Sequence, residues 1–250
     1  MTDNVLQAAV EQAADKIIVA LDCEMPRALE LADMLRGHAS WMKVGMTLYY
    51  SQGSKAVHEL KKRGYKVFVD LKLHDIPHQV KGAARSVALT GADMFTVHAG
   101  GGAPMMEAAV EGAREAMEKM PTGCDMPQIL AVTVLTSMDD PTLASVGVAD
   151  EAATQVKRLA TLAKGAGVSG VVASPKEAEM LKDVLGPQML IVTPGVRPAG
   201  SSAGDQARVT TPAQAFANGS THVVIGRPIM QADDPVAAFD AIAAQVAEVL

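Results

Sequence analysis

The sequence predicts an α/β fold, a single (β/α)8 TIM barrel, from three observations. The chain has 250 residues, a usual length for one such barrel. Hydrophobic residues make up 49% of it, which is enough for a large core. Eight short apolar runs alternate with helical patterns along the chain. We therefore predict one domain over residues 1–250, with residues 1–15 as an N-terminal helical extension.

The eight predicted strands are nearly continuous apolar segments, which is typical of parallel strands covered on both faces. They span residues 17–22, 41–46, 65–72, 93–99, 128–135, 168–174, 189–194 and 222–227. A doubly wound open sheet is the competing architecture. It is disfavoured because neither G-x-G-x-x-G nor G-x-x-x-x-G-K-[ST] follows the first strand.

Capping signals mark the helices between these strands. Pro26 suits the first turn of a helix that stops near Gly37. Capping-box patterns begin at Ser174 and at Thr211. Asp234 precedes a last helix, which we predict to run to Leu250.

Charge and cysteine content argue against several classes of protein. A net charge of −6 and a pI near 5.5 disfavour nucleic-acid binding. The basic run at residues 61–63 precedes Gly64, so we interpret it as the last turn of a helix. Cys23 and Cys124 lie in no Cys-x-x-Cys motif, which indicates a reduced, cytoplasmic protein. We find no signal peptide and no apolar run of the ~18 residues that a membrane helix needs, so we predict no membrane partner.

Charged side chains lie on or just after the first three predicted strands. They are Asp22, Lys43, Asp70, Lys72 and Asp75. In barrels of this class the active site lies at the carboxyl ends of the strands. Asp70 and Lys72 are two residues apart, so on a strand they point the same way. Burying five charges only for stability is unfavourable, because desolvation can cancel the Coulomb attraction. The cluster is therefore a candidate active site.

Two glycine–arginine segments after the seventh and eighth strands predict a phosphate site. They are Gly195 with Arg197, and Gly226 with Arg227. Glycine lets backbone N–H groups approach an anion, and each guanidinium adds charge and forked donors. Residues 198–212 lie between them and include Gln206. Their small side chains are compatible with a mobile lid or with an ordinary solvated loop.

Two histidines leave a second interpretation open. His74 and His98 are expected at the same rim, where they could join carboxylates around a divalent metal. No H-x-H or H-E-x-x-H spacing supports a ligand pair, so we predict no metal. The alternative function is a metal-dependent sugar-phosphate lyase or epimerase on the same barrel. A non-catalytic module that binds a phosphate ligand is a further alternative.

These segments together resemble the orotidine 5′-monophosphate decarboxylase family in its bacterial form. The segment DLKLHDIP (70–77) is similar to the family's Asp-x-Lys-x-x-Asp signature. The segments IIVALD, MKVGM, VTVLTSM, TPGVRP, GDQAR and VIGRPI resemble the family in the same order, over about residues 15–245. One departure is His78-Gln79, where the family commonly has Asn-Thr.

The resemblance implies a cofactor-free homodimer that converts orotidine 5′-monophosphate to UMP and CO2, the last step of de novo pyrimidine synthesis. It implies a C6 carbanion stabilised and protonated by Lys72. The other implied catalytic residues are Lys43, Asp70 and Asp75, with Asp75 contributed by the second subunit. The implied substrate-binding residues are Asp22, Lys43, His74, Ile76, Gln79, Thr136, Pro194, Arg197, Gln206, Gly226 and Arg227.

Overall fold

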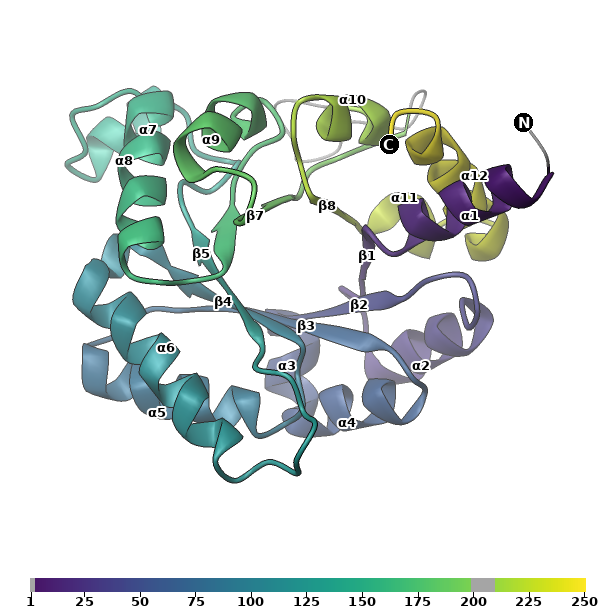
Figure 1. The fold of residues 1–250 in the computed structure, drawn as a ribbon, viewed down its shortest axis with the longest axis horizontal. Helices are drawn as coiled ribbons and strands as arrows, with labels where there is room; N and C mark the ends of the chain where they lie inside the picture. Colours follow the sequence, from purple (N-terminus) through teal and green to yellow (C-terminus); the bar gives the residue numbers. More distant parts are fainter. Residues whose placement is uncertain (1–2, 199–209) are drawn as a thin grey trace.

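The computed structural model describes residues 3–198 and 210–250, which form a closed barrel of eight parallel strands (Figure 1). The strands are β1 (Ile17–Ala20), β2 (Trp41–Gly45), β3 (Lys66–Leu73), β4 (Met94–His98), β5 (Gln128–Val132), β6 (Gly170–Val172), β7 (Leu190–Thr193) and β8 (His222–Ile225). Each strand pairs with the next in sequence, and β8 pairs with β1. The predicted (β/α)8 barrel is confirmed.

Helices surround the strands (Figure 1). They are α1 (Asp3–Ala14), α2 (Met25–Met34), α3 (Met46–Gln52), α4 (Ser54–Lys62), α5 (Pro77–Ala88), α6 (Ala103–Met117), α7 (Asp140–Ser145), α8 (Ala152–Gly165), α9 (Ala178–Leu185), α10 (Pro212–Ala217), α11 (Arg227–Met230) and α12 (Pro235–Ala247), with the 3-10 helix η1 (Ala99–Gly101) after β4. Helix α1 precedes the barrel and lies against α12, near the other end of the chain. Among these described helices, none is both long and apolar enough to cross a membrane.

Two of the predicted helix signals are confirmed. Pro26 lies in the first turn of α2, and Gly37 follows the end of this helix with a φ of 84°. Thr211 begins α10 with a complete capping box. Its hydroxyl accepts from the Gln214 N–H, and the Gln214 side chain accepts from the Thr211 N–H. A pair of side-chain hydrogen bonds therefore marks the start of α10, whereas a proline marks the start of α2.

Two other helix boundaries differ from the prediction. The Ser174 pattern forms only half of a capping box, because the Glu177 carboxylate accepts from the Ser174 N–H while the Ser174 hydroxyl faces the N–H of Lys176. Helix α9 consequently begins later, at Ala178. Helix α12 ends at Ala247 rather than Leu250, and the exposed Val249 and Leu250 lie beyond its end.

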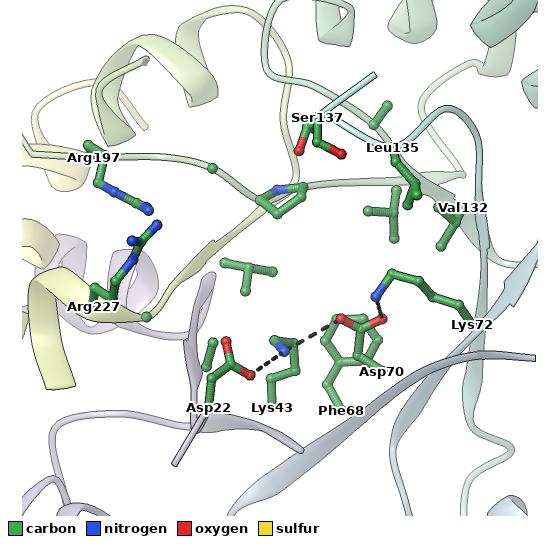
Figure 2. Close-up of a pocket in the computed structure, with 18 of the residues that line it drawn as sticks. Asp22, Lys43, Phe68, Asp70, Lys72, Val132, Leu135, Ser137, Arg197 and Arg227 are labelled. Atoms are coloured by element: carbon green, nitrogen blue, oxygen red, sulfur yellow. Dashed lines mark hydrogen bonds and ion pairs between the residues drawn. The ribbon is translucent and has the colours of Figure 1, made fainter. Parts of the chain in front are cut away.

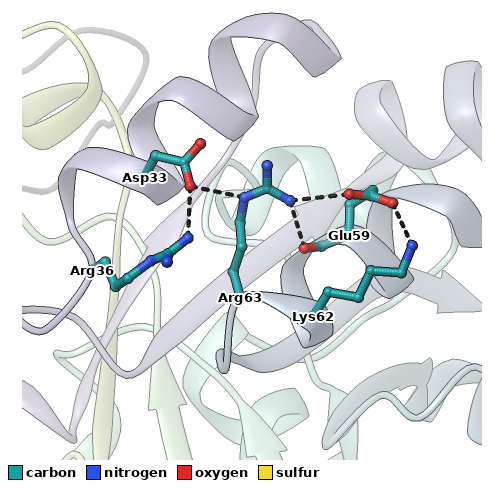
Figure 3. A network of polar contacts seen from close by, with 5 residues as sticks. All are labelled: Asp33, Arg36, Glu59, Lys62 and Arg63. Carbon is teal, nitrogen blue, oxygen red and sulfur yellow. Dashed lines mark hydrogen bonds and ion pairs between the residues drawn. The ribbon is translucent and has the colours of Figure 1, made fainter.

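The basic run at residues 61–63 ends α4, as predicted (Figure 3). Arg63 donates to Asp33 at 3.0 Å and to Glu59 at 3.1 Å. Arg36 pairs with the same aspartate at 2.9 Å, and Lys62 with the same glutamate at 2.9 Å. The Arg63–Asp33 pair connects the end of α4 to α2, whereas the other pairs are local to one helix end. The exposed Arg36–Asp33 pair contributes little to stability.

Apolar side chains fill the barrel in two layers. One layer lies between the strands and the helices and includes Ile17 and Val19. The other fills the barrel interior and consists of Ile18, Ala20, Trp41, Phe68, Met94, Leu130, Val192 and Val224. Side chains alternate along a strand, so the next interior positions toward the carboxyl ends are Asp22, Lys43, Asp70 and Thr96. The apolar interior thus becomes polar at one end of the barrel.

Candidate active site

A pocket of about 570 Å³ opens at the carboxyl ends of the strands. Its floor is formed by apolar residues that lie on the strands or shortly after them. They are Ala20, Phe68, Val132, Val134, Val172, Ala173 and Val224. Its polar lining consists of Asp22, Lys43, Asp70, Lys72, Thr136, Ser137, Arg197, Arg227 and Gln231. An apolar cavity with a few convergent polar groups is typical of a small-molecule site.

Four charged side chains form a chain of alternating sign along one wall of this pocket (Figure 2). Lys43 Nζ lies 3.1 Å from Asp22 Oδ1 and 3.5 Å from Asp70 Oδ2. Lys72 Nζ lies 2.9 Å from Asp70 Oδ1. The structure thus brings together four of the five predicted charged residues, and we call them the charge array.

Asp70 is the most buried carboxylate of the charge array. Burial by itself raises its pKa, but the charges of Lys43 and Lys72 oppose this effect. Hydrogen bonds from Lys72 and Thr96 lower the pKa further, and the net result is a pKa below the ordinary value. Asp70 therefore stays ionised at neutral pH and places a fixed negative charge beside the Lys72 ammonium.

Strand β3 is irregular where it carries these two charges. Val69 pairs with Phe95 and Leu73 with Val97, so β3 advances by four residues while β4 advances by two. Lys72 has a φ of 54°, and among the described residues it is the one non-glycine residue with positive φ. Asp70 and Lys72 line the same pocket, as the spacing predicted, but through a bulge rather than a regular strand.

Gly45 makes room for the other end of the charge array. A Cβ atom at this position would lie 2.8 Å from Asp22 Oδ1 and 3.0 Å from Lys43 Nζ. Both distances are too short for an undisturbed contact. The missing side chain therefore allows the carboxylate and the ammonium to meet above β2.

Two guanidinium groups lie across the pocket from the charge array (Figure 2). Arg197 follows β7 and is 6% exposed, and Arg227 is the first residue of α11. The flanking residues Pro194, Gly195 and Gly226 also line the pocket. The positive charge at this end suits an anion such as a phosphate.

The segment proposed as a lid falls largely outside the described residues. Val196 and Thr210 form an isolated parallel bridge, and the Arg197 N–H donates to the Thr210 carbonyl at 3.0 Å. Gln206 lies between these two points, in the part of the chain that the structure does not describe. Thr136 lines the pocket as expected, in the loop after β5.

Four predicted site residues do not line this pocket. They are His74, Asp75, Ile76 and Gln79, and all four are exposed around the start of α5. Asp75 Oδ1 accepts from the Ile76 N–H at 2.6 Å. Their roles at a substrate therefore stay predictions.

The two rim histidines stack on each other, with ring centroids 5.0 Å apart and planes at 12°. The pKa of His98 lies below its ordinary value because of burial and then the charges of His74 and Lys72. Within residues 3–198 and 210–250, no group of three or more His, Cys, Asp or Glu side chains is placed to hold a metal ion. The metal-site interpretation therefore has no candidate ligand set in this part of the chain.

The sequence reasoning missed several residues that line the pocket. Ser137 and Gln231 add polar groups to the pocket, and Phe68 forms part of its floor. Phe68 was detectable, because it lies two residues before Asp70 and thus on the same face of β3. Gln231 carries no local signal, because only the packing of α11 after β8 places it there.

Comparison with known proteins identifies the family. A model of the family described as "Orotidine 5'-phosphate decarboxylase / HUMPS family" matches residues 15–242. The chain belongs to this family. The resemblance inferred from the sequence motifs is thereby confirmed.

Individual members of the family are similar over nearly the whole chain. The orotidine 5′-phosphate decarboxylase of Moorella thermoacetica is 50% identical over 236 residues, which cover 94% of this chain and 93% of the relative. That of Alkalilimnicola ehrlichii is 52% identical over 225 residues, which cover 90% and 93%. The crystal structure of orotidine 5′-phosphate decarboxylase from Lactobacillus acidophilus superposes with a TM-score of 0.82 at 39% identity, over 93% of this chain and 99% of that one.

Proposed function

We propose that this chain decarboxylates orotidine 5′-monophosphate to UMP and CO2, the last step of de novo pyrimidine synthesis. One observation carries the proposal beyond family membership. A single pocket holds the charge array on one wall and the two guanidinium groups across from it. The first can act on a reacting carboxylate, and the second can hold a phosphate.

The substrate would bind with its phosphate between Arg197 and Arg227, where charge-assisted and bidentate hydrogen bonds are strongest. Gly226 would bring its backbone close to the same group, and Gln206 would add an amide. The ribose hydroxyls would lie against Asp22 and Lys43, and the pyrimidine against Thr136 and Pro194. This orientation places C6 of the pyrimidine at the Asp70–Lys72 end of the charge array.

The chemistry would rest on Lys72. Loss of CO2 leaves a carbanion at C6 with no adjacent carbonyl to delocalise it, so a nearby cation must stabilise the charge. The Lys72 ammonium can do so and can then donate a proton to C6. Asp70 would repel the substrate carboxylate, but two like charges ~4 Å apart interact by only about 4 kcal/mol at an effective dielectric of ~20. The largest enzymatic accelerations need about 23 kcal/mol or more, so stabilisation of the transition state must supply most of the effect.

We further propose a homodimer in which Asp75 enters the pocket of the partner subunit. Asp75 and Ile76 are exposed and lie outside the pocket of their own chain, and the Ile76 side chain is 63% exposed. The proposal rests on the family resemblance, which implies a homodimer with Asp75 contributed by the second subunit. Gln79 and His74 would accompany Asp75 and Ile76, with Gln79 in place of the family's usual Thr.

The first test is an absorbance assay that follows loss of the orotate chromophore of orotidine 5′-monophosphate, with and without EDTA. We expect rapid loss that EDTA does not affect. No loss would indicate a non-catalytic binding module, and loss that EDTA stops would indicate a metal-dependent enzyme.

The shared site is tested by mixing two inactive variants, Lys72→Ala and Asp75→Asn. In hybrid dimers one of the two pockets regains both native residues. If subunits exchange at random, half of the dimers are hybrids and about a quarter of the wild-type activity should return. No return of activity, with subunit exchange verified by mass spectrometry, would place Asp75 in the pocket of its own subunit.

A further inference from the structure

Thr96 lies on β4 opposite the bulge of β3, and its side chain makes two hydrogen bonds to the charge array. Its hydroxyl oxygen accepts from the Lys72 backbone N–H at 2.8 Å. The same hydroxyl donates to Asp70 Oδ1 at 3.0 Å. Thr96 is fully buried and does not line the pocket. It therefore touches the catalytic candidates and cannot touch the substrate.

The bond from the Lys72 N–H to the Thr96 hydroxyl replaces a ladder hydrogen bond where the backbone of β3 is irregular. Between the pairs Val69–Phe95 and Leu73–Val97, the regular ladder of hydrogen bonds from β3 to β4 is interrupted. Lys72 adopts a positive φ of 54° there, a conformation that is costly for a residue with a Cβ atom. The Thr96 hydroxyl gives the Lys72 N–H a partner at this point.

The second bond fixes the carboxylate to which Lys72 binds. Asp70 Oδ1 accepts from both Lys72 Nζ and Thr96, while Asp70 Oδ2 faces Lys43. Threonine is suited to holding the Asp70 carboxylate because its β-branched side chain has few χ1 rotamers. The direction of its hydroxyl is therefore restricted by the side chain itself. Thr96 thus holds both the backbone of Lys72 and the partner of its ammonium.

We propose that Thr96 is a positioning residue for the reaction and acts through Asp70 and Lys72. The inference rests on the proposed function, since it assigns Lys72 as the group that meets the reacting carbon. A small displacement of such a group lowers the rate of the chemical step by as much as ~100-fold. The phosphate and ribose contacts lie elsewhere in the pocket, so substrate affinity should be retained.

The test uses Thr96→Val, which keeps the shape and removes the hydroxyl, and Thr96→Ser, which keeps the hydroxyl. We expect Thr96→Val to lower kcat ~10-fold to ~100-fold with KM within ~3-fold of wild type. Thr96→Ser should stay within ~3-fold of wild-type kcat. The matched control is Thr193→Val, which removes another buried strand hydroxyl, one bonded to Ser220 and remote from the charge array. Its kcat should not change.

A second readout does not depend on activity. Hydrogen exchange of the Lys72 amide, measured by NMR, should be at least ~10-fold faster in Thr96→Val than in wild type and unchanged in Thr193→Val. If Thr96→Val does not fold, Thr96→Ala takes its place in both measurements with the same criteria.

The inference is overturned if the hydroxyl-free variant keeps wild-type kcat, or if its KM changes as much as its kcat. It is equally overturned if Thr96→Ser loses as much activity as Thr96→Val. If wild-type protein does not consume orotidine 5′-monophosphate, the proposed function fails instead. The amide exchange of Lys72 then still decides whether Thr96 holds this backbone.

Discussion

The two ends of the barrel both carry charged residues, but they arrange them differently. At the carboxyl end, Lys43 lies between two carboxylates and Asp70 between two ammonium groups, on the wall of an open pocket. At the amino end, Lys61 makes two hydrogen bonds to Asp93, whose carboxylate also accepts from the Val67 N–H at 2.7 Å. Lys61 and Asp93 thus pair with each other, and Asp93 also binds the backbone of β3.

The rings of Trp41 and His222 also lie at the amino end of the barrel. Lys66 Nζ lies 5.6 Å from the centre of the Trp41 ring, a distance at which a cation is attracted to the face of an aromatic ring. His222 meets the same ring edge-on, with centroids 6.1 Å apart. The pKa of His222 is lowered to about 4, first by burial and then by the charges of Lys16 and Lys66.

From this difference we expect the charges at the amino end to serve stability and those at the carboxyl end to serve the proposed chemistry. Charges at the amino end are paired within the fold, and in barrels this end mainly contributes stability. The carboxyl end concentrates four charges of alternating sign and a residue with positive φ around a cavity. Backbone strain of this kind persists at functional sites because the surrounding structure enforces it.

The largest effect on activity is expected from removing the Lys72 side chain at the carboxyl end of the barrel. Lys72→Ala should lower kcat by at least ~10⁴-fold, because it removes both the cation and the proton donor. The melting temperature should change by only a few degrees, because Asp70 keeps Lys43 and Thr96 as partners. The control is Lys66→Ala at the amino end, which should keep kcat/KM within ~2-fold. Substantial turnover by Lys72→Ala would remove Lys72 from its proposed role.

The second largest effect is expected at the end of the same pocket where Arg197 and Arg227 lie. Arg227→Ala should raise KM and lower kcat/KM by ~100-fold to ~1,000-fold, because a charge-assisted contact to the substrate is lost. Arg36→Ala, which removes an exposed arginine of the network in Figure 3, should leave both constants unchanged. An unchanged kcat/KM in Arg227→Ala would contradict the phosphate assignment.

At the amino end, a change of pH should alter the free energy of unfolding rather than the rate of catalysis. His222 has a folded pKa of about 4 against an ordinary value near 6.5, so the unfolded state binds the proton more readily. The contribution of His222 to the free energy of unfolding is fully present above about pH 6.5, and up to about 3 kcal/mol of it is lost as the pH falls toward 4. Urea unfolding at several pH values measures it. The variant His222→Gln should flatten the profile in this window, and an unchanged profile would show that other groups cause it.

The smallest effect is expected from a substitution at Gly45, which tests how closely the positions of Asp22 and Lys43 in the charge array must be kept. Gly45→Ala places a Cβ atom against Asp22 and Lys43, and the exposed Asp22 carboxylate can move away. We expect kcat/KM to fall ~10-fold with little change in melting temperature, because the ribose contacts would shift while the core stays intact. The matched control is Gly37→Asn, in a turn where an added side chain meets no neighbour. Wild-type kcat/KM in Gly45→Ala would show that the Asp22–Lys43 contact is dispensable.

Much of the fold was predictable because its signals are local. The apolar runs gave all eight strands, and their two-residue alternation placed Asp22, Lys43 and Asp70 in the interior beyond Ala20, Trp41 and Phe68. Several predicted strands are longer than the observed ones, as at residues 168–174 against Gly170–Val172, because the residues beyond the ladder turn into loops. The pocket charges were found for the same reason, since strand ends meet at one rim of a barrel.

The sequence alone thus determined the barrel, its polar rim and the identity of the charged residues. The tertiary structure decided the bulge in β3, the positive φ of Lys72 and the contact of both Asp70 and Lys72 with Thr96. It also decided that Arg197 and Arg227 face the same pocket. These features arise where distant segments pair and pack, since the bulge exists only in the pairing of β3 with β4. The pattern along a single segment therefore does not show them.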